Sequence, residues 1–468
     1  MMKAKIHYYD IGDYLSREDK LKTIERFSSI ENIPWTIVEP NEHGDWLNKR
    51  SELFQLYTPL EPTKKFRKGN KSFFIGYSLG LGTNRDSWVY NSSIKKLHCN
   101  VDKTISFYNQ QVDAYNVQIP IEEFLIDKRD SSKIVWTDTL IRDLRKKLKY
   151  TIDNTRYTVG IYRPYYKQNL YQDRILNHRV YQIPKLFPTQ KHKNMVICVS
   201  GVGASKDFST LITDYIPNLD TLEKNQCFPL YWYDDSTSDI ADLFSTPDKK
   251  LDPYIRRDGV TDWILTTARK QYGNKVTKED IFYYVYGILH SSDYRTAFAA
   301  DLKKSLPRLP LVESPDDFWA FSKAGRDLAE LHLNYEKVEP FRGCIVFHAA
   351  STTKGDSINY RVEKMRFGKI DSKTADKTII HYNNCITISG IPLEAYEYVI
   401  NGKSAIEWIM ERYQVKTDPA SGILNDPNDW AKEHNDEKYI LNLLLSVINV
   451  SIKTIDIVKA LPRLKFEE

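Results

Sequence analysis

The feature that most constrains the fold of this 468-residue chain is a change in the spacing of its apolar residues. From about residue 73 to 235, short apolar runs such as NMVICVSG end in glycine, as buried strands do. From about residue 261, apolar residues recur at helical spacing, beginning with TKEDIFYYVYGILHS. A second strand-rich patch covers residues 341–388, and helical spacing then returns. The sequence therefore predicts a mixed α/β (α+β) fold: a strand-rich region, then helical subdomains, with a second short strand patch.

Capping residues and apolar runs predict individual elements. Ser16 is a plausible N-cap for a helix over the stretch REDKLKTIERF, and Thr277 with Asp280 has capping-box spacing before an apolar run. SFFIGYSLG, residues 72–80, is predicted to be an aromatic-rich strand. AKIHYYDIG, near the start, is also strand-like. A strand this early needs a partner, so we expect it to be the tail of a sheet that lies outside the chain or elsewhere in it.

Breaks in these patterns predict five segments. The stretch EPTKKFRKGNKS, residues 61–72, is polar, basic and rich in turn formers, and we expect a loop or linker there. The segments are an N-terminal piece over 1–60, an α/β region over 61–255, a helical subdomain over 256–340, a small strand-rich segment over 341–400 and a C-terminal helical segment over 401–468.

Composition narrows the class of protein. Hydrophobic residues make up 41% and charged residues 28%, as in folded globular proteins. The net charge of +5 favours a polyanion only if it is concentrated on one face. The scattered Cys99, Cys198, Cys227, Cys344 and Cys385 imply neither a zinc site nor a disulfide framework. The N-terminus lacks a signal-peptide core, and the apolar run YILNLLLSVINVSI is too short and polar to span a bilayer. We predict a soluble cytoplasmic protein with no membrane partner.

Catalytic motifs are incomplete. GYSLG, residues 76–80, has the Gly-x-Ser-x-Gly spacing of a nucleophile elbow around Ser78, but turn formers follow it where a hydrolase requires a helix. SGVGAS, residues 200–205, lacks the third glycine of a dinucleotide loop and the Gly-Lys-Ser/Thr of a P-loop, which favours a structural turn. No Asp/Asn-Pro-Pro-aromatic tetrapeptide and no His-Glu-x-x-His is present. We therefore predict no catalytic residue and no metal ligand in this chain.

Three basic clusters point to a polyanion. They are the loop over 61–72, the basic face of the helix predicted over TDTLIRDLRKKLKY, and the tyrosine-rich stretch YRPYYKQNLYQDRILNHR. Lysines and arginines bind phosphates with counterion release, and an arginine fork can read guanine edges. The alternatives are a solvated loop, a plain solvent face and a tyrosine-rich strand with charged ends. The candidate residues, in cluster order, are Lys64, Lys65, Arg67, Lys68 and Lys71; Arg145 and Lys149; and Arg163, Tyr165, Tyr166, Lys167 and Arg174.

Several stretches, taken together and in order, resemble one family. They are GTNRDSWVYN, TISFYNQQ, YRPYYKQNLY, SGVGASKDFSTLITDYIPNLD, NQCFPLYWYD, TKEDIFYYVYGILHSSDYR, FWAFSKAGRDLAELHLNYE, SGIPLEAYEYVINGKSAIEWIMERYQV and NDPNDW. Over about residues 70–465 the chain resembles the C-terminal specificity region of type ISP restriction–modification enzymes. The opening AKIHYYDIGDYLSREDKL resembles the last strand and helix of the adenine methyltransferase domain that precedes this region in the family. The resemblance makes residues 1–60 a remnant of that domain and 61–255 a DNA target recognition region.

The resemblance implies that this chain recognises DNA and carries out no catalysis by itself. In the family, one polypeptide carries a nuclease, an ATP-driven translocase, a coupler, an adenine methyltransferase and a target recognition domain, and it acts in phage defence. The motifs for cofactor binding, methylation, translocation and cleavage are absent from this sequence. We expect sequence-specific binding of double-stranded DNA, with the other domains or subunits as partners. S-adenosylmethionine, ATP and Mg²⁺ are expected only in the full-length enzyme, and no cofactor in this chain.

Two alternatives remain open. The chain could be the DNA-binding half of a split adenine methyltransferase that acts with a separate catalytic chain. It could instead be a docking module for the coupler or methyltransferase, through the helices over 261–335 and from 403 onward. The resemblance also leaves open whether the chain is a piece of a larger enzyme, a split-gene specificity subunit or a gene remnant.

The stretch GTNRDSWVYN lies early in the resembling region. Gly80 and Gly82 permit a tight turn there. One hypothesis makes Asn84 or Arg85 a DNA contact. The other is a structural turn in which Arg85 pairs with Asp86 while the aromatic residues anchor the following segment. Lys206, in the stretch SGVGASKDFST, is a further DNA-contact candidate.

Overall fold

The elements follow the order that the apolar spacing predicts, and the predicted mixed α/β fold is confirmed. The structure is a computed structural model that describes residues 4–12, 15–47, 49–62, 71–235, 252–348 and 359–466. The chain forms two compact units, Met1–Leu56 and Tyr57–Glu468, here called unit 1 and unit 2. The segments predicted beyond residue 60 are thus grouped in one unit, and its large core cluster takes buried residues from Leu81 to Trp232 and from Tyr335 to Val450.

Unit 1 is a small strand pair with helices. Strand β1 (Ile6–Tyr8) pairs antiparallel with β2 (Thr36–Val38), so the early strand has its partner within the same unit. Helix α1 (Arg17–Phe27) begins after Ser16, whose side chain accepts a hydrogen bond from the Asp19 amide, as its capping pattern predicts. The remaining elements of the unit are η1 (Ile30–Asn32) and α2 (Glu52–Leu56).

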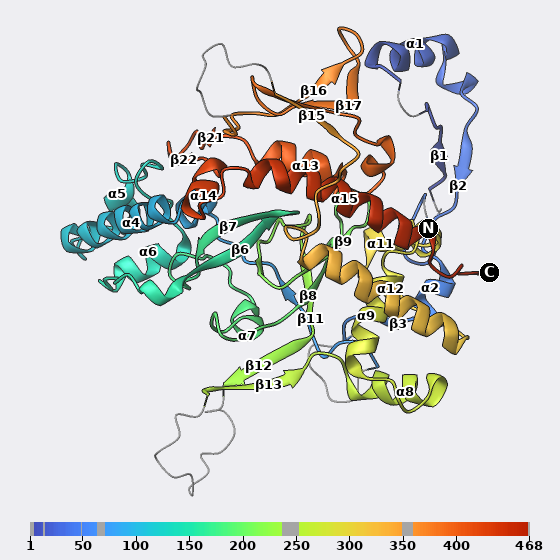
Figure 1. Cartoon of the computed structure of the whole chain (residues 1–468), viewed down its shortest axis with the longest axis horizontal. Helices are drawn as coiled ribbons and strands as arrows, with labels where there is room; N and C mark the ends of the chain where they lie inside the picture. The colour runs from blue at the N-terminus through green and yellow to red at the C-terminus, as the bar shows by residue number, and fades with distance from the viewer. Residues whose placement is uncertain are drawn as a thin grey trace, which may run out of the picture. The chain divides into compact units, whose positions relative to one another are not determined.

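Two four-stranded sheets form the centre of unit 2 (Figure 1). One has the order β10-β6-β7-β5, and the other has the order β4-β11-β8-β9. All their pairings are antiparallel except β10 with β6. The strands are β4 (Ser78–Leu79), β5 (Tyr90–Asn91), β6 (Tyr157–Arg163), β7 (Tyr166–Tyr171), β8 (Val196–Val199), β9 (Thr210–Thr213), β10 (Ile216–Pro217) and β11 (Gln226–Pro229).

The strand predicted over SFFIGYSLG is mostly wrong. Only Ser78 and Leu79 form a strand, although Phe73 and Phe74 are fully buried. The amides of these two phenylalanines bond to the carbonyls of Pro59 and Leu60. The amide of the next residue bonds to another segment, at Gly259. Backbone groups that pair with several segments cannot build one ladder, so burial here does not produce a strand.

The two glycine-rich stretches are structural. Gly80 lies so close to the backbone of Asn218 that an added Cβ would stand 2.3 Å from its carbonyl oxygen. The Ser78 hydroxyl donates to the Leu79 carbonyl and accepts from the Gln182 amide, and no helix follows it directly, so the elbow interpretation is wrong. SGVGAS connects β8 to β9, which pair antiparallel. Gly201 there packs against the Lys224 carbonyl.

Three helices pack against the sheets on one side of unit 2: α9 (Lys278–Ile288), α12 (Pro315–Leu333) and α15 (Tyr439–Lys459) (Figure 1). The predicted capping box between Thr277 and Asp280 is confirmed at the start of α9. Helices α9 and α12 cross where Gly287 and Gly325 face each other's backbones, which lets the helices approach closely. Of the described helices, α15 alone is long and apolar enough to cross a membrane, and 61% of its apolar window is buried inside the protein.

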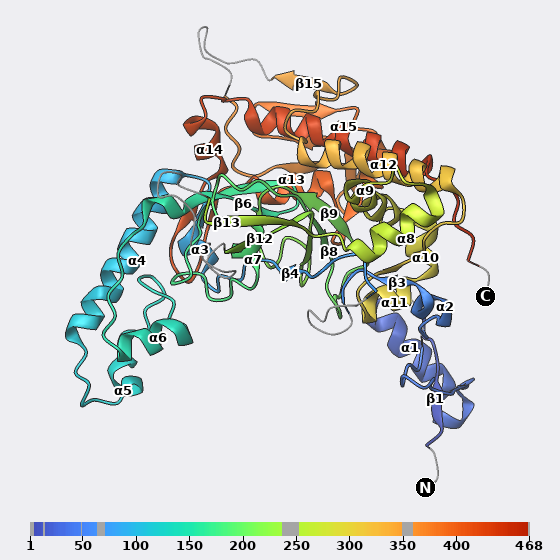
Figure 2. The ribbon, with the colours of Figure 1, turned by 90° about the horizontal axis from the view of Figure 1, so that it is seen from below.

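A helical arm extends away from the sheets in both views (Figures 1 and 2). It consists of α4 (Ile94–Ala114), α5 (Ile121–Leu125) and α6 (Asp138–Arg145), and follows the short helix α3 (Asp86–Val89). We call residues 94–150 the arm.

The second strand patch is a sheet with the order β15-β18-β17-β16. Its strands are β15 (Ile345–His348), β16 (Arg366–Lys369), β17 (Ala375–His381) and β18 (Ile386–Ser389). The other elements are β3 (Thr58–Pro59), η2 (Asn154–Arg156), α7 (Ile183–Leu186), β12 (Tyr231–Asp235), β13 (Tyr254–Asp258), α8 (Asp262–Tyr272), α10 (Ser292–Ala297), α11 (Ala299–Lys304), β14 (Arg308–Leu309), η4 (Leu393–Tyr396), β19 (Val399–Ile400), β20 (Lys403–Ser404), α13 (Ala405–Arg412), β21 (Lys416–Thr417), β22 (Leu424–Asn425) and α14 (Pro427–Glu433).

Candidate nucleic-acid interface

The tyrosine-rich stretch YRPYYKQNLY forms the β6–β7 hairpin, and most of its polar groups point inward. Every residue of β7 is buried. The hydroxyl of Tyr165 lies 3.1 Å from that of Tyr398, and the hydroxyl of Tyr166 accepts hydrogen bonds from Gln168 and Asn425. The predicted DNA contacts Tyr165 and Tyr166 therefore belong to the core of this structure.

Lys167 is also engaged inside the protein. Its ammonium group forms a 2.8 Å ion pair with Glu336, and only 7% of its side chain is exposed. It also lies over the rings of Tyr215 and Tyr335. The interleaved basic and aromatic residues predict a surface that binds DNA. Side chains alternate between the two faces of a strand, but both faces of β7 are buried, so Lys167 does not reach solvent.

Two candidate arginines, Arg163 in this hairpin and Arg174 beyond it, reach the surface. The Arg163 guanidinium lies 4.1 Å from the centre of the Tyr162 ring. It donates hydrogen bonds to the Tyr162 carbonyl and to the Asn218 side chain. Arg174 is exposed beyond the end of β7. Neither arginine forms an ion pair within the described part of the chain, so both keep donors for an external ligand.

The stretch GTNRDSWVYN contains one exposed candidate and one buried candidate. Asn84 is exposed in a left-handed turn, at φ 54°. Arg85 is 3% exposed, and its Nη2 donates to Thr137 at the start of α6. Burial lowers the pKa of Arg85 to about 10. Asp86 does not pair with Arg85 as one hypothesis expected; it accepts hydrogen bonds from Thr83 and Tyr162.

The arm carries an exposed basic face on and after α6. Leu140 and Leu144 are buried on one side of the helix, and the basic residues lie on the other side. Arg145 lies 4.0 Å from Glu122, and Lys149 lies 2.6 Å from Asp113. Ion pairs between such exposed side chains contribute little to stability, so phosphates can replace the carboxylates as partners of these cations. The exposed cations of this face are Arg142, Arg145, Lys146, Lys147 and Lys149.

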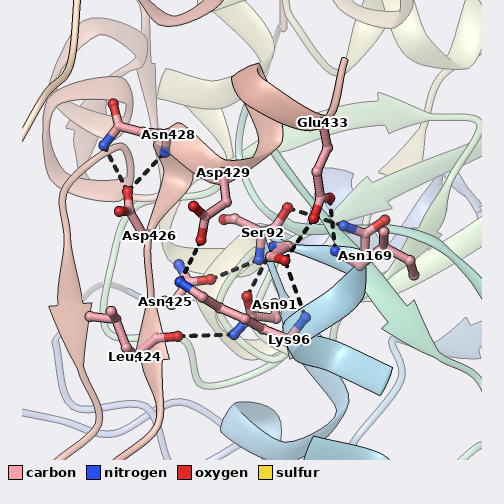
Figure 3. A network of polar contacts seen from close by, with 12 residues as sticks. Asn91, Ser92, Lys96, Asn169, Leu424, Asn425, Asp426, Asn428, Asp429 and Glu433 are labelled. Atoms are coloured by element: carbon pink, nitrogen blue, oxygen red, sulfur yellow. Dashed lines mark hydrogen bonds and ion pairs between the residues drawn. The ribbon is translucent and has the colours of Figure 1, made fainter. Parts of the chain in front are cut away.

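A polar network holds the base of the arm to the C-terminal region (Figure 3). The Glu433 carboxylate accepts hydrogen bonds from the Ser93 hydroxyl and the Ile94 amide at the start of α4. A carboxylate at this end of a helix satisfies free amides and interacts favourably with the helix dipole. Lys96, one turn later, forms a 2.6 Å ion pair with Asp429.

The same network reaches the β6–β7 hairpin. Asn425 accepts a hydrogen bond from the Ser92 amide and another from Gln168 of β7, and Asn169 of β7 donates to the Ser92 carbonyl (Figure 3). Residues 424–433 thus join the arm to the β6–β7 hairpin. Sequence reasoning did not predict these contacts, because the partners are more than 250 residues apart. The one available signal was the quoted block NDPNDW, which contains Asp429.

The remaining candidates lie apart from this network. Lys71 is exposed at the start of unit 2's first buried stretch, and Lys206 is exposed on the β8–β9 connection, where its aliphatic chain lies beside Gly402. Lys64, Lys65, Arg67 and Lys68 lie outside the described residues. In the described ranges, no group of three or more His, Cys, Asp or Glu residues is arranged to hold a metal ion.

These features define a large mixed α/β module with a basic arm fixed beside a hairpin that presents arginines. The family model of the type ISP C-terminal specificity domain matches residues 72–443, which is most of the chain. The protein therefore belongs to the family of type ISP C-terminal specificity domains. No curated protein matches it.

Several solved structures are similar to nearly the whole chain. The nuclease-deletion mutant of the type ISP restriction–modification enzyme LlaGI, in complex with a DNA substrate mimic, is 36% identical with a TM-score of 0.82, covering 99% of this chain and 40% of that one. The ATP-dependent type ISP enzyme LlaBIII bound to DNA is 34% identical with a TM-score of 0.83, covering 99% and 28%. A DrdV–DNA complex is 27% identical with a TM-score of 0.81, covering 99% and 44%. The chain thus spans less than half the length of each of these proteins.

Proposed function

We propose that this chain recognises a specific sequence in double-stranded DNA, as the specificity part of a type ISP restriction–modification system. The observation that carries the proposal is the match to the type ISP specificity domain, together with similarity over 99% of the chain to enzymes solved with DNA. The proposal assigns no catalysis to this chain by itself. Methylation, translocation and cleavage would be supplied by other domains or subunits of the system.

The candidate DNA contacts fall into two groups, those whose side chains reach solvent and those whose side chains are buried. Arg163, half-buried at the hairpin, and Arg174, exposed beyond β7, are proposed to read base edges in the major groove, because a guanidinium fork matches the acceptors of guanine. The exposed cations are proposed to contact phosphates. Arg85, Tyr165, Tyr166 and Lys167 are proposed to shape the interface from inside rather than to touch DNA. The exposed residues proposed as phosphate or backbone contacts are Lys71, Asn84, Arg145, Lys149 and Lys206. Lys64, Lys65, Arg67 and Lys68 lie outside the described residues and are proposed as phosphate contacts on their charge alone.

The exposed apolar side chains of unit 1 favour docking of this unit to another domain. Several of its apolar side chains face solvent, and apolar residues gathered in one small unit favour a protein partner. We propose that the partner is the adenine methyltransferase part of the same system. The residues are Leu21, Ile24, Ile30 and Ile37, which are 49%, 54%, 70% and 56% exposed.

A selection from a random duplex pool with this chain at low salt tests the proposal. Enrichment of a short asymmetric motif, with affinity that falls as salt rises, is the expected result. Salt-sensitive binding without an enriched motif would contradict autonomous recognition. Repeating the selection with the methyltransferase part added would then show whether the partner is needed to position the DNA.

A further inference from the structure

Two cationic side chains, Arg412 and Lys416, line a cavity beside the β6–β7 hairpin. This cavity of about 270 Å³ opens where the hairpin, α3 and the segment 411–425 meet. Tyr162, Tyr166, Arg412 and Lys416 are among the residues that line it. The sequence predicts that this segment belongs to the C-terminal helical segment, and none of the candidate DNA contacts lies in it. The structure brings it to the edge of the proposed DNA surface.

Arg412 is held in place, and 22% of its side chain is exposed. Its guanidinium lies 5.2 Å from the centre of the Trp408 ring, and its Nη2 lies 2.6 Å from Glu411. Its Nε is buried and finds no hydrogen-bond partner within the described part of the chain. A guanidinium oriented by a ring and one carboxylate is well placed to bind a second anion.

Two cations, Arg412 and Lys416, and three carboxylates, Asp86, Glu411 and Asp418, line this cavity. Three further cations, Arg163, Lys364 and Lys403, lie close enough to act on Arg412 or Lys416. Lys416 is exposed and forms no ion pair within the described residues. Burial, followed by the charge of Arg412, lowers the pKa of Lys416. The charge of Glu411 acts in the opposite direction, and Lys364 and Lys403 act in the same direction as Arg412. The charge of Arg163 likewise helps to lower the pKa of Arg412, after burial.

The carboxylates at the cavity are already used. Glu411 is shared between Lys403 and Arg412. Asp86 accepts hydrogen bonds from the hydroxyls of Thr83 and Tyr162, and Asp418 accepts from Ser421. With Arg163, Lys364 and Lys403 included, the cations of this region outnumber these three carboxylates, so an external anion would reduce the repulsion among them.

We propose that Arg412 and Lys416 form a cationic rim that binds backbone phosphates of the DNA whose bases are read beside it. This inference rests on the proposed function and adds to it a phosphate contact from the C-terminal segment. The rim adjoins Arg163, so a duplex that reaches the hairpin passes it. Arg412 contributes a planar fork that can bind one phosphate through two donors, and Lys416 contributes a flexible point charge.

The test compares the double variant Arg412→Gln/Lys416→Gln with the unaltered chain in salt titrations of duplex binding. Removing two phosphate contacts is expected to reduce the slope of log K against log [salt] by about 2, and to weaken binding to all sequences alike. The selected motif is expected to stay the same. The matched control is Lys270→Gln/Lys275→Gln, which removes the same charge from exposed positions on and after α8, on the other side of unit 2 from α14 (Figures 1 and 2).

Each outcome decides a different point. A wild-type slope in the double variant, with the motif still selected, would overturn the rim and leave DNA recognition intact. An equal loss in the control would show that net charge alone acts, which also overturns the rim. Failure of the unaltered chain to bind DNA would overturn both proposals. If the double variant does not fold, Lys416→Gln alone, at an exposed position, is expected to reduce the slope by about 1.

Discussion

At the scale of the residue, exposure rather than residue type separates the proposed DNA contacts from the structural residues. Tyr165, Tyr166 and Lys167 stand beside Arg163 in sequence, yet they are buried and bonded to distant parts of the core. Arg163 lies at the end of β6, where the hairpin turns and its side chain reaches solvent. Substitutions at Arg163 and at the three buried residues are therefore expected to have different effects.

We expect Arg163→Gln to relax base preference at one position of the selected motif. Loss of a bidentate arginine–guanine contact reduces discrimination by about 1–3 kcal/mol. Binding to duplexes that differ from the motif at single positions measures this loss. Arg156→Gln, at the opposite end of β6, is the matched control and should keep the preference. An unchanged preference in Arg163→Gln would remove this residue from the reading surface.

Gly325 tests the close crossing of α9 and α12. An added Cβ at this position would lie 1.9 Å from the carbonyl oxygen of Tyr283, so Gly325→Ala must push the helices apart. Overpacking of this kind costs about 1–3 kcal/mol, and we expect a loss of that order in the free energy of unfolding. Denaturant unfolding measures it. Lys323→Ala, at a 77% exposed side chain on the same helix, should change stability by less than about 0.5 kcal/mol. Equal stability of the two variants would contradict the tight crossing.

At the scale of the element, the arm depends on residues that lie far away in the sequence. The first turn of α4 is capped by its own Ser93 and by Glu433, which is 340 residues further along the chain. The basic face of α6 is carried by the same arm, so α14 fixes the base from which that face is presented. This arrangement links the C-terminal region to the proposed phosphate contacts.

We expect Glu433→Ala to destabilise the protein by about 1–3 kcal/mol, because two hydrogen bonds to a charged acceptor and a favourable interaction with the helix dipole are lost together. Amide hydrogen exchange should show faster exchange in the first turn of α4. Glu437→Ala, on the exposed loop after α14, serves as the control. Wild-type protection of Ile94 in Glu433→Ala would show that the Ser93 cap is sufficient.

At the scale of the whole molecule, a buried histidine joins three helices of the core. His332 of α12 forms hydrogen bonds with Tyr286 of α9 and with Thr454 of α15. Burial, assisted by the charge of Arg295, lowers the pKa of His332 to about 3. The neutral ring therefore stabilises the fold fully above the ordinary histidine pKa of 6.5, and this stability is lost as the pH falls from there toward 3.

We expect His332→Gln to flatten the dependence of stability on pH between about 6.5 and 3, because glutamine keeps hydrogen-bonding groups without titrating. Thermal unfolding across this range measures the effect. Some dependence should remain, since burial also lowers the pKa of His290. His434→Gln, at an exposed histidine, should retain the wild-type profile. An unchanged slope in His332→Gln would contradict a neutral, buried ring.

Patterns within a few residues were readable from the sequence. The N-cap at Ser16, the capping box at Thr277, the buried run of β8 and the helical spacing of α9, α12 and α15 depend on neighbours in the chain, and the structure confirms them. The strand predicted over SFFIGYSLG is mostly wrong, because the backbone of this stretch pairs with several segments at once. The interface candidates were drawn from residue type, which does not encode exposure.

The sequence by itself determined the fold class, the order of the elements and, through its motifs, the family. Only the tertiary structure decided which side chains reach solvent and which distant segments meet. The physical reason is that periodicity and capping are local, whereas burial depends on what packs over a strand. Lys167 becomes a core residue because Glu336 lies against it, and the arm gains its cap because α14 returns to the start of α4.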